Sequence, residues 1–298
     1  MSDAALNASI YVAVMLCGRP HYTSLSARAL PRSPFVHVHV FPDRCALSDY
    51  LPTLYSPAHI HNLPETQLGP DANSKRAVRT FVQSDSSYQF LLVLDTDGML
   101  ARSWAEDARS AMPLTSGVLG LYNSNGHATI NRTVLKSVAG SFNVCYKRDI
   151  GLFGIMMTRQ RAIEALNSSP DPKRPGFDWG FSHDFNKRGI SLAVFCNSRV
   201  MHYGAFGAHN NPKYNVEREL NFIDTANPFY QEALYFQQGH VTKPYSVYIW
   251  LYIYFGLLVL AVVAMPGLSR RRHALKRVCT LNRWQSKPSI FGRADSAT

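Results

Sequence analysis

Two carboxylates at the end of an apolar segment are the clearest sign of chemistry in this sequence. The segment Phe90–Leu94 is wholly apolar, Asp95 follows it directly, and Asp97 comes two positions later. Residues i and i+2 of an extended chain face the same side, so both carboxylates can converge on one cation. Such oxygen ligands suit Mg²⁺ or Mn²⁺, and these metals in turn bind diphosphate oxygens. A plain turn is the alternative, because aspartate and glycine commonly follow a strand.

A further acidic residue opens a predicted helix. The stretch Asp178–Arg188 is amphipathic, and Gly189 follows it as a favoured residue beyond a helix end. Asp178 stands where the helix dipole and the free N–H groups stabilise a carboxylate. The carboxylate could therefore act on a substrate or could only cap the helix.

A histidine beside glycine is the third candidate. His202 lies in the segment Val200–Gly204, after the predicted strand Leu192–Phe195. A neutral imidazole can complete the coordination of a metal that carboxylates already hold. The alternative is a histidine with a purely structural role.

Alternating strand-like and helix-like segments predict the scaffold that positions these side chains. This alternation indicates an α/β fold with a mostly parallel sheet that helices cover on both faces. Such sheets bind ligands at the carboxyl ends of their strands. The predicted strands are Ile10–Leu16, Phe35–Phe41, Phe90–Leu94, Gly117–Leu121, Gly151–Met157 and Leu192–Phe195, and the predicted helices are Pro20–Leu30, Ala72–Gln83, Trp104–Ala111 and Asp178–Arg188. The segment Ser124–Val144, rich in Asn, Ser and Gly, is expected to be a variable loop.

Composition excludes several other classes of protein. With 298 residues, 46% hydrophobic and 17% charged, the chain is neither disordered nor collagen-like nor a disulfide-dense module. The five cysteines are widely spaced and form no CxxC pair, which disfavours a zinc knot. We expect them to be reduced and mostly buried.

The C-terminal part reads as a membrane anchor. No charged residue occurs from Pro244 to Ser269, and the stretch Tyr245–Leu268 is long enough to cross a bilayer. Eight basic residues and one acid follow. Beside a membrane segment, such a tail indicates contact with anionic lipid rather than with nucleic acid. The expected organisation is a domain at 1–240, a single transmembrane helix with its flanks at 241–269, and a basic tail at 270–298.

Taken in order, these pieces resemble the family-2-like glycosyltransferases with a GT-A fold. The resemblance spans about residues 9–210. It rests on the opening strand and loop Tyr11–Pro20, a second strand ending in Asp43, a helix opening with Asn73-Ser74-Lys75-Arg76-Ala77, the DxD at Asp95–Asp97, Asp178-Trp179 eleven residues before Gly189, and the HxG-like end Val200–Gly204.

The resemblance implies a role for each matched residue. Asp43 would contact the nucleobase or ribose of a nucleotide-diphosphate sugar, and Lys75 and Arg76 would lie near the nucleotide. Asp97, with Asp95, would hold Mn²⁺ or Mg²⁺ on the diphosphate, and His202 would help to hold the metal or the diphosphate. Asp178 would be the general base of an inverting transfer to a hydroxyl of a glycan or lipid-linked acceptor. These roles are those of the matched positions: Asp43, Lys75, Arg76, Asp95, Asp97, Asp178 and His202.

The match to the family departs at the base. The family usually has an acidic pair there, whereas Phe177 precedes Asp178 in this sequence. That departure leaves Asp184, one and a half turns further along the helix, as an alternative acid.

Two other functions stay open at this point. A Mg²⁺-dependent nucleotidyl- or phosphotransferase would use the same acidic pair, although no GxxxxGK[ST] loop occurs. A non-catalytic membrane-anchored protein could keep the fold without the activity. The basic tail favours an external or lumenal catalytic domain. The missing signal peptide, the expected free thiols and the usual location of nucleotide sugars favour a cytoplasmic one, which we expect.

Overall fold

The computed structural model describes residues 8–45, 54–55, 57–204 and 221–237 of the chain. The chain divides into two compact units, Met1–His240 and Val241–Thr298, and every described residue belongs to the first. The predicted membrane segment Tyr245–Leu268 and the basic tail lie outside the described residues. Among the helices that are described, none has the length and apolar character needed to span a bilayer.

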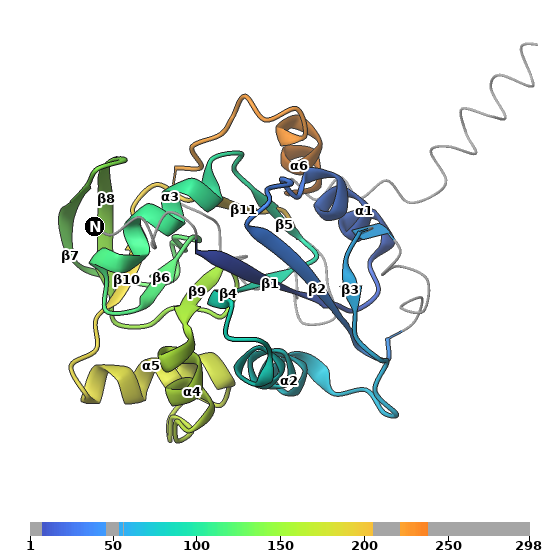
Figure 1. Ribbon diagram of the computed structural model, residues 1–298, viewed down its shortest axis with the longest axis horizontal. Helices are drawn as coiled ribbons and strands as arrows, with labels where there is room; N and C mark the ends of the chain where they lie inside the picture. The colour runs from blue at the N-terminus through green and yellow to red at the C-terminus, as the bar shows by residue number, and fades with distance from the viewer. Residues whose placement is uncertain (1–7, 46–53, 56, 205–220, 238–298) are drawn as a thin grey trace, which may run out of the picture. The chain divides into compact units, whose positions relative to one another are not determined.

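A mixed sheet forms the centre of the first unit (Figure 1). In the described part of the chain it has nine strands in the order β3-β2-β1-β4-β9-β6-β10-β8-β7. Parallel pairing joins β3, β2, β1 and β4, and in this sheet only the described strands β9 and β8 run against the others. The strands are β1 Ser9–Leu16, β2 Val36–Pro42, β3 His59–Ile60, β4 Tyr88–Asp95, β6 Val118–Gly120, β7 Thr129–Ser137, β8 Gly140–Lys147, β9 Ile155–Thr158 and β10 Leu192–Phe195. The predicted mostly parallel α/β sheet is confirmed.

Helices cover both faces of this sheet, as predicted. Figure 1 shows α2, α4 and α5 on one side and α1, α3 and α6 on the other. Alternate residues of β1 divide between the two cores, because successive side chains of a strand point to opposite faces. Ile10 packs in the core that holds Trp104 of α3, and Tyr11 packs in the core that holds Phe81 of α2 and Phe181 of α5. The helices are α1 Pro20–Ala29, α2 Gly69–Gln83, α3 Trp104–Ala111, α4 Arg159–Leu166, α5 Phe177–Lys187 and α6 Tyr230–Gln237, with a 3-10 turn at Met112–Leu114.

A separate two-stranded sheet fixes the segment after β4. Strand β5, Gly98–Leu100, pairs antiparallel with β11, Val200–His202, and the register places His202 opposite Gly98. The backbone N–H of Tyr203 then donates to the carbonyl of Asp97 at 3.0 Å. This small sheet therefore brings the predicted histidine to the predicted acidic pair.

One predicted loop is wrong. Much of the segment Ser124–Val144 lies in the antiparallel hairpin of β7 and β8, paired from Thr129 to Lys147. The turn is made at Val138 and Ala139, and polar residues are frequent because every residue of β7 is exposed or only partly buried. Sequence polarity alone does not separate such an exposed hairpin from a loop.

The predicted state of the cysteines is also wrong for four of the five. Cys17 is bonded to Cys45, and Cys145 is bonded to Cys196, with Cα–Cα distances of 5.3 and 5.1 Å. Sheet pairing brings both pairs together, because Cys17 and Cys45 follow the neighbouring strands β1 and β2, and Cys145 lies on β8 beside β10. The fifth cysteine lies outside the described residues.

Candidate active site

A cavity of about 270 Å³ opens at the carboxyl end of β4. Asp95, the last residue of β4, and Asp178, in the first turn of α5, both line it. Asp71 from the start of α2 adds a third carboxylate. The remaining lining residues are Pro70, Ser74, Val93, Tyr122, His127, Gly151, Leu152, Phe153 and Trp179. A cavity lined by three carboxylates attracts cations.

The carboxyl of Asp95 titrates unusually high. Burial raises its pKa to about 6, and the negative charge of Asp97 adds to the shift. Arg19 and His202 act in the opposite direction without cancelling these effects. Asp95 therefore carries a charge at neutral pH that a bound cation would stabilise.

Asp97 is fixed as an anion by two partners. One of its oxygens, Oδ2, lies 2.5 Å from Nη1 of Arg19 and 3.3 Å from Nε2 of His202. Burial opposes ionisation, but the charges of His202 and Arg19 hold the pKa of this carboxyl well below its usual range. Gly204 lets the chain pass this group, because a β-carbon there would collide with the Asp97 carboxylate. The glycine of the HxG-like segment thus has a steric reason to be glycine.

The acidic pair fits a divalent cation, and His202 fits a supporting role better than a ligand role. Within the described residues, Oδ1 of Asp97 is buried without a hydrogen-bond partner, and Asp95 reaches the cavity. Oδ1 of Asp97 and the carboxylate of Asp95 are the groups that would hold Mn²⁺ or Mg²⁺. Asp95, Asp97 and His202 do not form one of the described trios whose ligand atoms lie within 4.8 Å of one another. His202 instead contacts Asp97, which places it behind a ligand, a common position for a residue that orients it.

The start of α5 presents Asp178 to the cavity. Gly176, before the helix, has φ of 137°, and a β-carbon there would press on Trp179 and on the Asp178 carboxylate. Oδ1 of Asp178 accepts a hydrogen bond from the Trp179 N–H at 2.9 Å. Burial raises the pKa of Asp178, and the charge of Asp71 raises it further. A half-buried carboxylate with a raised pKa is suited to accept a proton.

An aromatic wall stands beside this carboxylate. The rings of Trp179 and His127 are 5.3 Å apart, and the guanidinium of Arg174 lies 4.0 Å from the Trp179 ring. The loop that carries His127 is tied down by Lys147, a buried side chain whose Nζ donates to the His127 and Ser124 carbonyls at 2.7 Å. Arg174 therefore packs on the Trp179 end of this wall, and Lys147 fixes the loop at the His127 end.

Of the predicted site residues, Asp95 and Asp178 line the cavity and the other six do not; three of these six, Asp184, Lys75 and Arg76, make other contacts. Asp184 faces Arg188, with Nη1 to Oδ2 at 3.4 Å, and its other contact is Ser168. Lys75 is exposed, with its ammonium 5.4 Å from the Phe177 ring. Arg76 donates to the carbonyls of Pro42 and Asn62, which fastens α2 to the chain before it.

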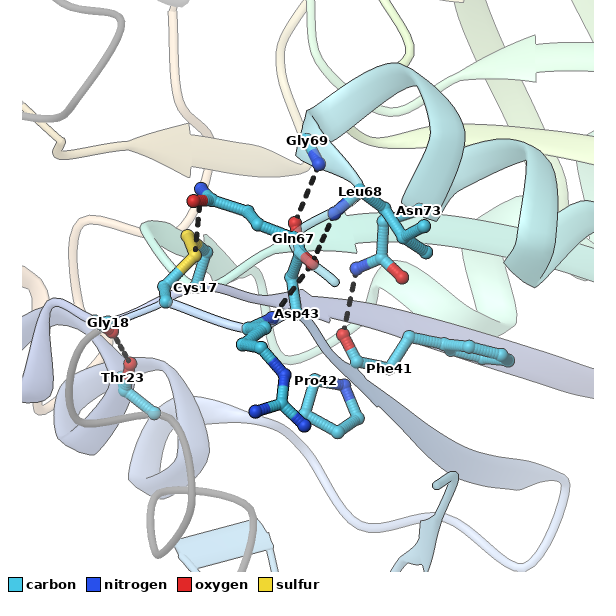
Figure 2. The surroundings of a disulfide bond; sticks show 12 residues. Cys17, Gly18, Thr23, Phe41, Pro42, Asp43, Gln67, Leu68, Gly69 and Asn73 are labelled. Atoms are coloured by element: carbon cyan, nitrogen blue, oxygen red, sulfur yellow. Dashed lines mark hydrogen bonds between the residues drawn. A yellow bond between two sulfur atoms is a disulfide. The ribbon is translucent and has the colours of Figure 1, made fainter. Parts of the chain in front are cut away.

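Asp43 has a structural task in this fold (Figure 2). Its carboxylate accepts hydrogen bonds from the backbone N–H groups of Arg44, Leu68 and Gly69, each at 2.8 Å. Gly69 begins α2, so Asp43 caps that helix from the end of β2. Figure 2 also shows the Cys17–Cys45 disulfide beside it, which joins the segments that follow β1 and β2.

Arg19 is the main site residue that motif reasoning missed. It follows β1 and Gly18, and its backbone is left-handed with φ of 56° and ψ of 61°. A non-glycine residue pays about 1–2 kcal/mol for this conformation, so its place beside Asp97 offsets a local cost. A basic residue between glycine and proline at a strand end was the available signal. His127 and Asp71 had no comparable sequence signal, because only the fold brings them to the cavity.

Several solved structures are similar to this chain. TarS 1–349 from S. aureus is similar with a TM-score of 0.45 and 14% identity, over 63% of this chain and 58% of that one. GalNAc-T7 with UDP, GalNAc and Mn²⁺ is similar with a TM-score of 0.46 and 13% identity, over 65% and 44%. A UDP-glucose pyrophosphorylase complexed with UDP-glucose has a TM-score of 0.42 and 9% identity, over 63% and 90%. The chain thus spans 58% of the TarS fragment and less than half of GalNAc-T7.

Sequence comparison alone finds no relative. No family model matches the chain, and no characterised protein matches it significantly in sequence. The structures named above all have TM-scores below 0.5, so their likeness carries no argument about this chain. The argument for an activity comes from the cavity.

Proposed function

We propose that the protein is a glycosyltransferase that moves a sugar from a nucleotide-diphosphate donor to a hydroxyl acceptor. One observation carries the proposal: a single cavity is lined both by Asp95 of the acidic pair and by Asp178, a carboxylate of raised pKa at the start of α5. The first group suits a cation on a diphosphate, and the second suits a base for the acceptor. A donor with its cation and an acceptor with its base would then meet in one cavity.

The donor half uses the pair Asp95 and Asp97. A divalent metal held there would supply positive charge to the leaving diphosphate. Arg19 and His202 keep Asp97 ionised and oriented, so the pair is ready for the cation. Asp71 and Ser74 at the start of α2 border the same space.

The acceptor half uses Asp178. Its carboxylate would take the proton from the acceptor hydroxyl as the acceptor oxygen forms a bond to the anomeric carbon. The bond from that carbon to the donor phosphate oxygen breaks, and the nucleoside diphosphate leaves with the electron pair. This single displacement inverts the anomeric centre. Trp179 beside Asp178 offers an apolar face to a sugar ring.

The membrane part of the proposal rests on sequence. The stretch Tyr245–Leu268 would anchor the enzyme, and the basic residues after it would contact anionic lipid. An enzyme held at a membrane would meet a lipid-linked or surface glycan acceptor, so we propose an acceptor of this class.

Asp178→Asn tests the reaction directly. With purified full-length protein in detergent and Mn²⁺, we expect this variant to lose about 10²–10⁴-fold in transfer rate. Thermal shifts with UDP, GDP, CDP and dTDP should remain as in the unsubstituted protein, because the donor half is untouched. Asp184→Asn is the matched comparison, since its carboxylate pairs with Arg188 outside the cavity, and it should keep its activity.

Four results would count against the proposal. A fully active Asp178→Asn variant would show that Asp178 is not the general base. Loss of activity only in Asp184→Asn would assign that role to Asp184. Release of a phosphoryl or nucleotidyl product instead of a transferred sugar would favour a nucleotidyl- or phosphotransferase. Absence of any metal-dependent nucleotide shift would favour a non-catalytic protein.

A further inference from the structure

Three histidines meet at the outer edge of the main sheet, and none of them lines the cavity. His39 lies on β2, His59 on β3, and His61 directly after β3. One ring nitrogen of each lies within 4.8 Å of the other two. His39 and His61 are half-buried and His59 is exposed, so the cluster is open to an ion from solvent.

Strand register brings the three rings together. Strands β2 and β3 are parallel, and their register places His39 opposite His59. His59 and His61 are two positions apart, so they face the same side of the extended chain. The His61 N–H donates to the Val40 carbonyl at 3.0 Å, which continues the pairing past β3.

The spacing of the rings is that of ligands around one tetrahedral metal. Metal–nitrogen bonds of 2.0–2.1 Å place neighbouring ligand nitrogens about 3.3 Å apart and ring centroids about 5 Å apart. Nδ1 of His39 lies 3.3 Å from Nε2 of His61. The centroid distances are 5.3 Å for His39 and His59, 5.5 Å for His39 and His61, and 4.6 Å for His59 and His61.

Aromatic neighbours hold two of the rings in place. Tyr11 stacks on His39 with a centroid distance of 3.7 Å, and Phe41 stacks on His61 at 4.0 Å. Oη of Tyr11 lies 3.2 Å from Nε2 of His61. Packing that fixes the rings before the metal arrives lowers the entropy lost on binding.

Charged groups near the cluster do not prevent a cation. The positive charge of Arg76 acts on His61 electrostatically, and the negative charge of Asp43 acts on Arg76 in the opposite sense. The other titratable neighbours of His39 are His37 on the same strand and the phenols of Tyr11 and Tyr88. Among the described residues, the guanidinium of Arg76 is the positive charge that acts on His61, and it has an acidic partner in Asp43.

We propose that His39, His59 and His61 bind a Zn²⁺ ion, with a fourth position left to water. A set of imidazoles suits zinc rather than Mg²⁺ or Mn²⁺, so this site differs in chemistry from the acidic pair of the cavity. The ion fastens the two-residue strand β3 to β2. The chain after His61 continues to Leu68 and Gly69, which Asp43 binds, so the ion also steadies the approach to α2.

Cobalt binding tests the site, with zinc as competitor. Full-length protein in detergent, stripped with EDTA and kept free of reductant, is titrated with Co²⁺ in an Asp95→Asn background. Visible absorption bands of tetrahedral Co²⁺ should grow to one equivalent and disappear when Zn²⁺ is added. His39→Asn, His59→Asn and His61→Asn should each weaken binding by at least about 10-fold. His37→Asn is the matched control from the same strand and should bind as the parent does.

Thermal unfolding separates lost ligands from lost folding. Zinc at a hundred times the Kd of the parent should raise the Tm of the parent by about 5 °C and that of the histidine variants by about half as much or less. If His39→Asn fails to fold, His59→Asn still tests the site, because His59 is exposed and its substitution should leave the fold intact. No tetrahedral Co²⁺ spectrum, or binding that survives all three substitutions, overturns the proposal and leaves three histidine rings in contact without an ion. Activity of the cavity is not a readout, so these outcomes are independent of the proposed transfer reaction.

Discussion

At the scale of single residues, the two carboxylates after β4 do different work. Arg19 and His202 contact Asp97 and keep it ionised, whereas the pKa of Asp95 rises to about 6 because of burial and the charge of Asp97. Asp97 is therefore ionised at all ordinary pH values, whereas the ionised form of Asp95 is unfavourable in the folded protein. Such local instability is common where a site awaits a cation.

Asp95→Asn should separate binding from stability. A carboxyl with a raised pKa binds its proton more tightly in the folded state, so its ionised form destabilises the fold above that pKa. Without metal, we expect the variant to melt about 2–6 °C higher than the parent at pH 8 and equally at pH 4. Calorimetry in EDTA measures this, and exposed Glu65→Gln serves as the control that changes one surface charge.

The same substitution should abolish tight Mn²⁺ binding. In the parent, Mn²⁺ affinity should fall as the pH drops through about 6, because protonation of Asp95 removes a ligand charge. In the calorimetry without metal, an Asp95→Asn variant that melts lower than the parent at pH 8 would show that Asp95 makes a stabilising native contact. Mn²⁺ affinity that is flat between pH 5 and 8 would exclude Asp95 as a ligand.

At the scale of elements, the end of β2 and the start of α2 act as one unit. Asp43 binds the first N–H groups of α2, and Asn73 of that helix donates to the Phe41 carbonyl of β2 at 3.0 Å. Since α2 contributes Pro70, Asp71 and Ser74 to the cavity, this contact positions one wall of the site. The nucleotide role implied for Asp43 by resemblance remains untested, while the capping role follows from geometry.

Asp43→Ala should therefore destabilise the domain. Three backbone N–H groups lose a buried charged acceptor, which typically costs about 1–3 kcal/mol. Urea unfolding followed by circular dichroism measures this loss. Asp71→Ala is the matched control, because it removes an exposed carboxylate from the first turn of the same helix. Equal stability of the two variants would show that the Asp43 cap contributes nothing, and a nucleotide role would then be the better explanation of its burial.

The elements themselves were largely readable from sequence. Helix α3 and strand β10 have the predicted bounds, and β1, β2, β4 and α5 differ by a residue or two at each end. These segments carry long apolar patterns, which are the strongest local signal. Strand β7 of the hairpin was missed because neither of its faces is consistently apolar, whereas the apolar residues Phe142, Val144 and Tyr146 alternate along its partner β8.

The residues of the site could be predicted from the sequence only in part, because several of them are brought together only by tertiary structure. Asp95, Asp97, Asp178 and His202 were selected by motif, and the fold brings all four to one end of the sheet. Contacts set by tertiary structure could not be found in this way. The register that gathers the three histidines leaves no local pattern, and cysteine spacing does not predict which pairs form.

At the scale of the whole molecule, the two disulfides change the argument on topology. The expectation of a cytoplasmic catalytic domain used free thiols as one of its reasons, and the pairs Cys17–Cys45 and Cys145–Cys196 remove that reason. Disulfides persist mainly in oxidising compartments. The basic tail after Tyr245–Leu268 independently favours a cytoplasmic tail. The location of most nucleotide sugars remains the argument for the cytoplasm.

We infer an external or lumenal catalytic domain, and thiol counting in cells tests it. Cells are lysed in denaturant with a polyethylene glycol maleimide, which adds one gel shift for each free thiol. With five cysteines and two disulfides, we expect one shift without reductant and five after reduction. Cys145→Ser should add one further shift without reductant, because it frees Cys196, and Cys279→Ser should remove the single one. Five shifts without reductant would mean that the chain is reduced where it works, and the cytoplasmic orientation would then be the correct one.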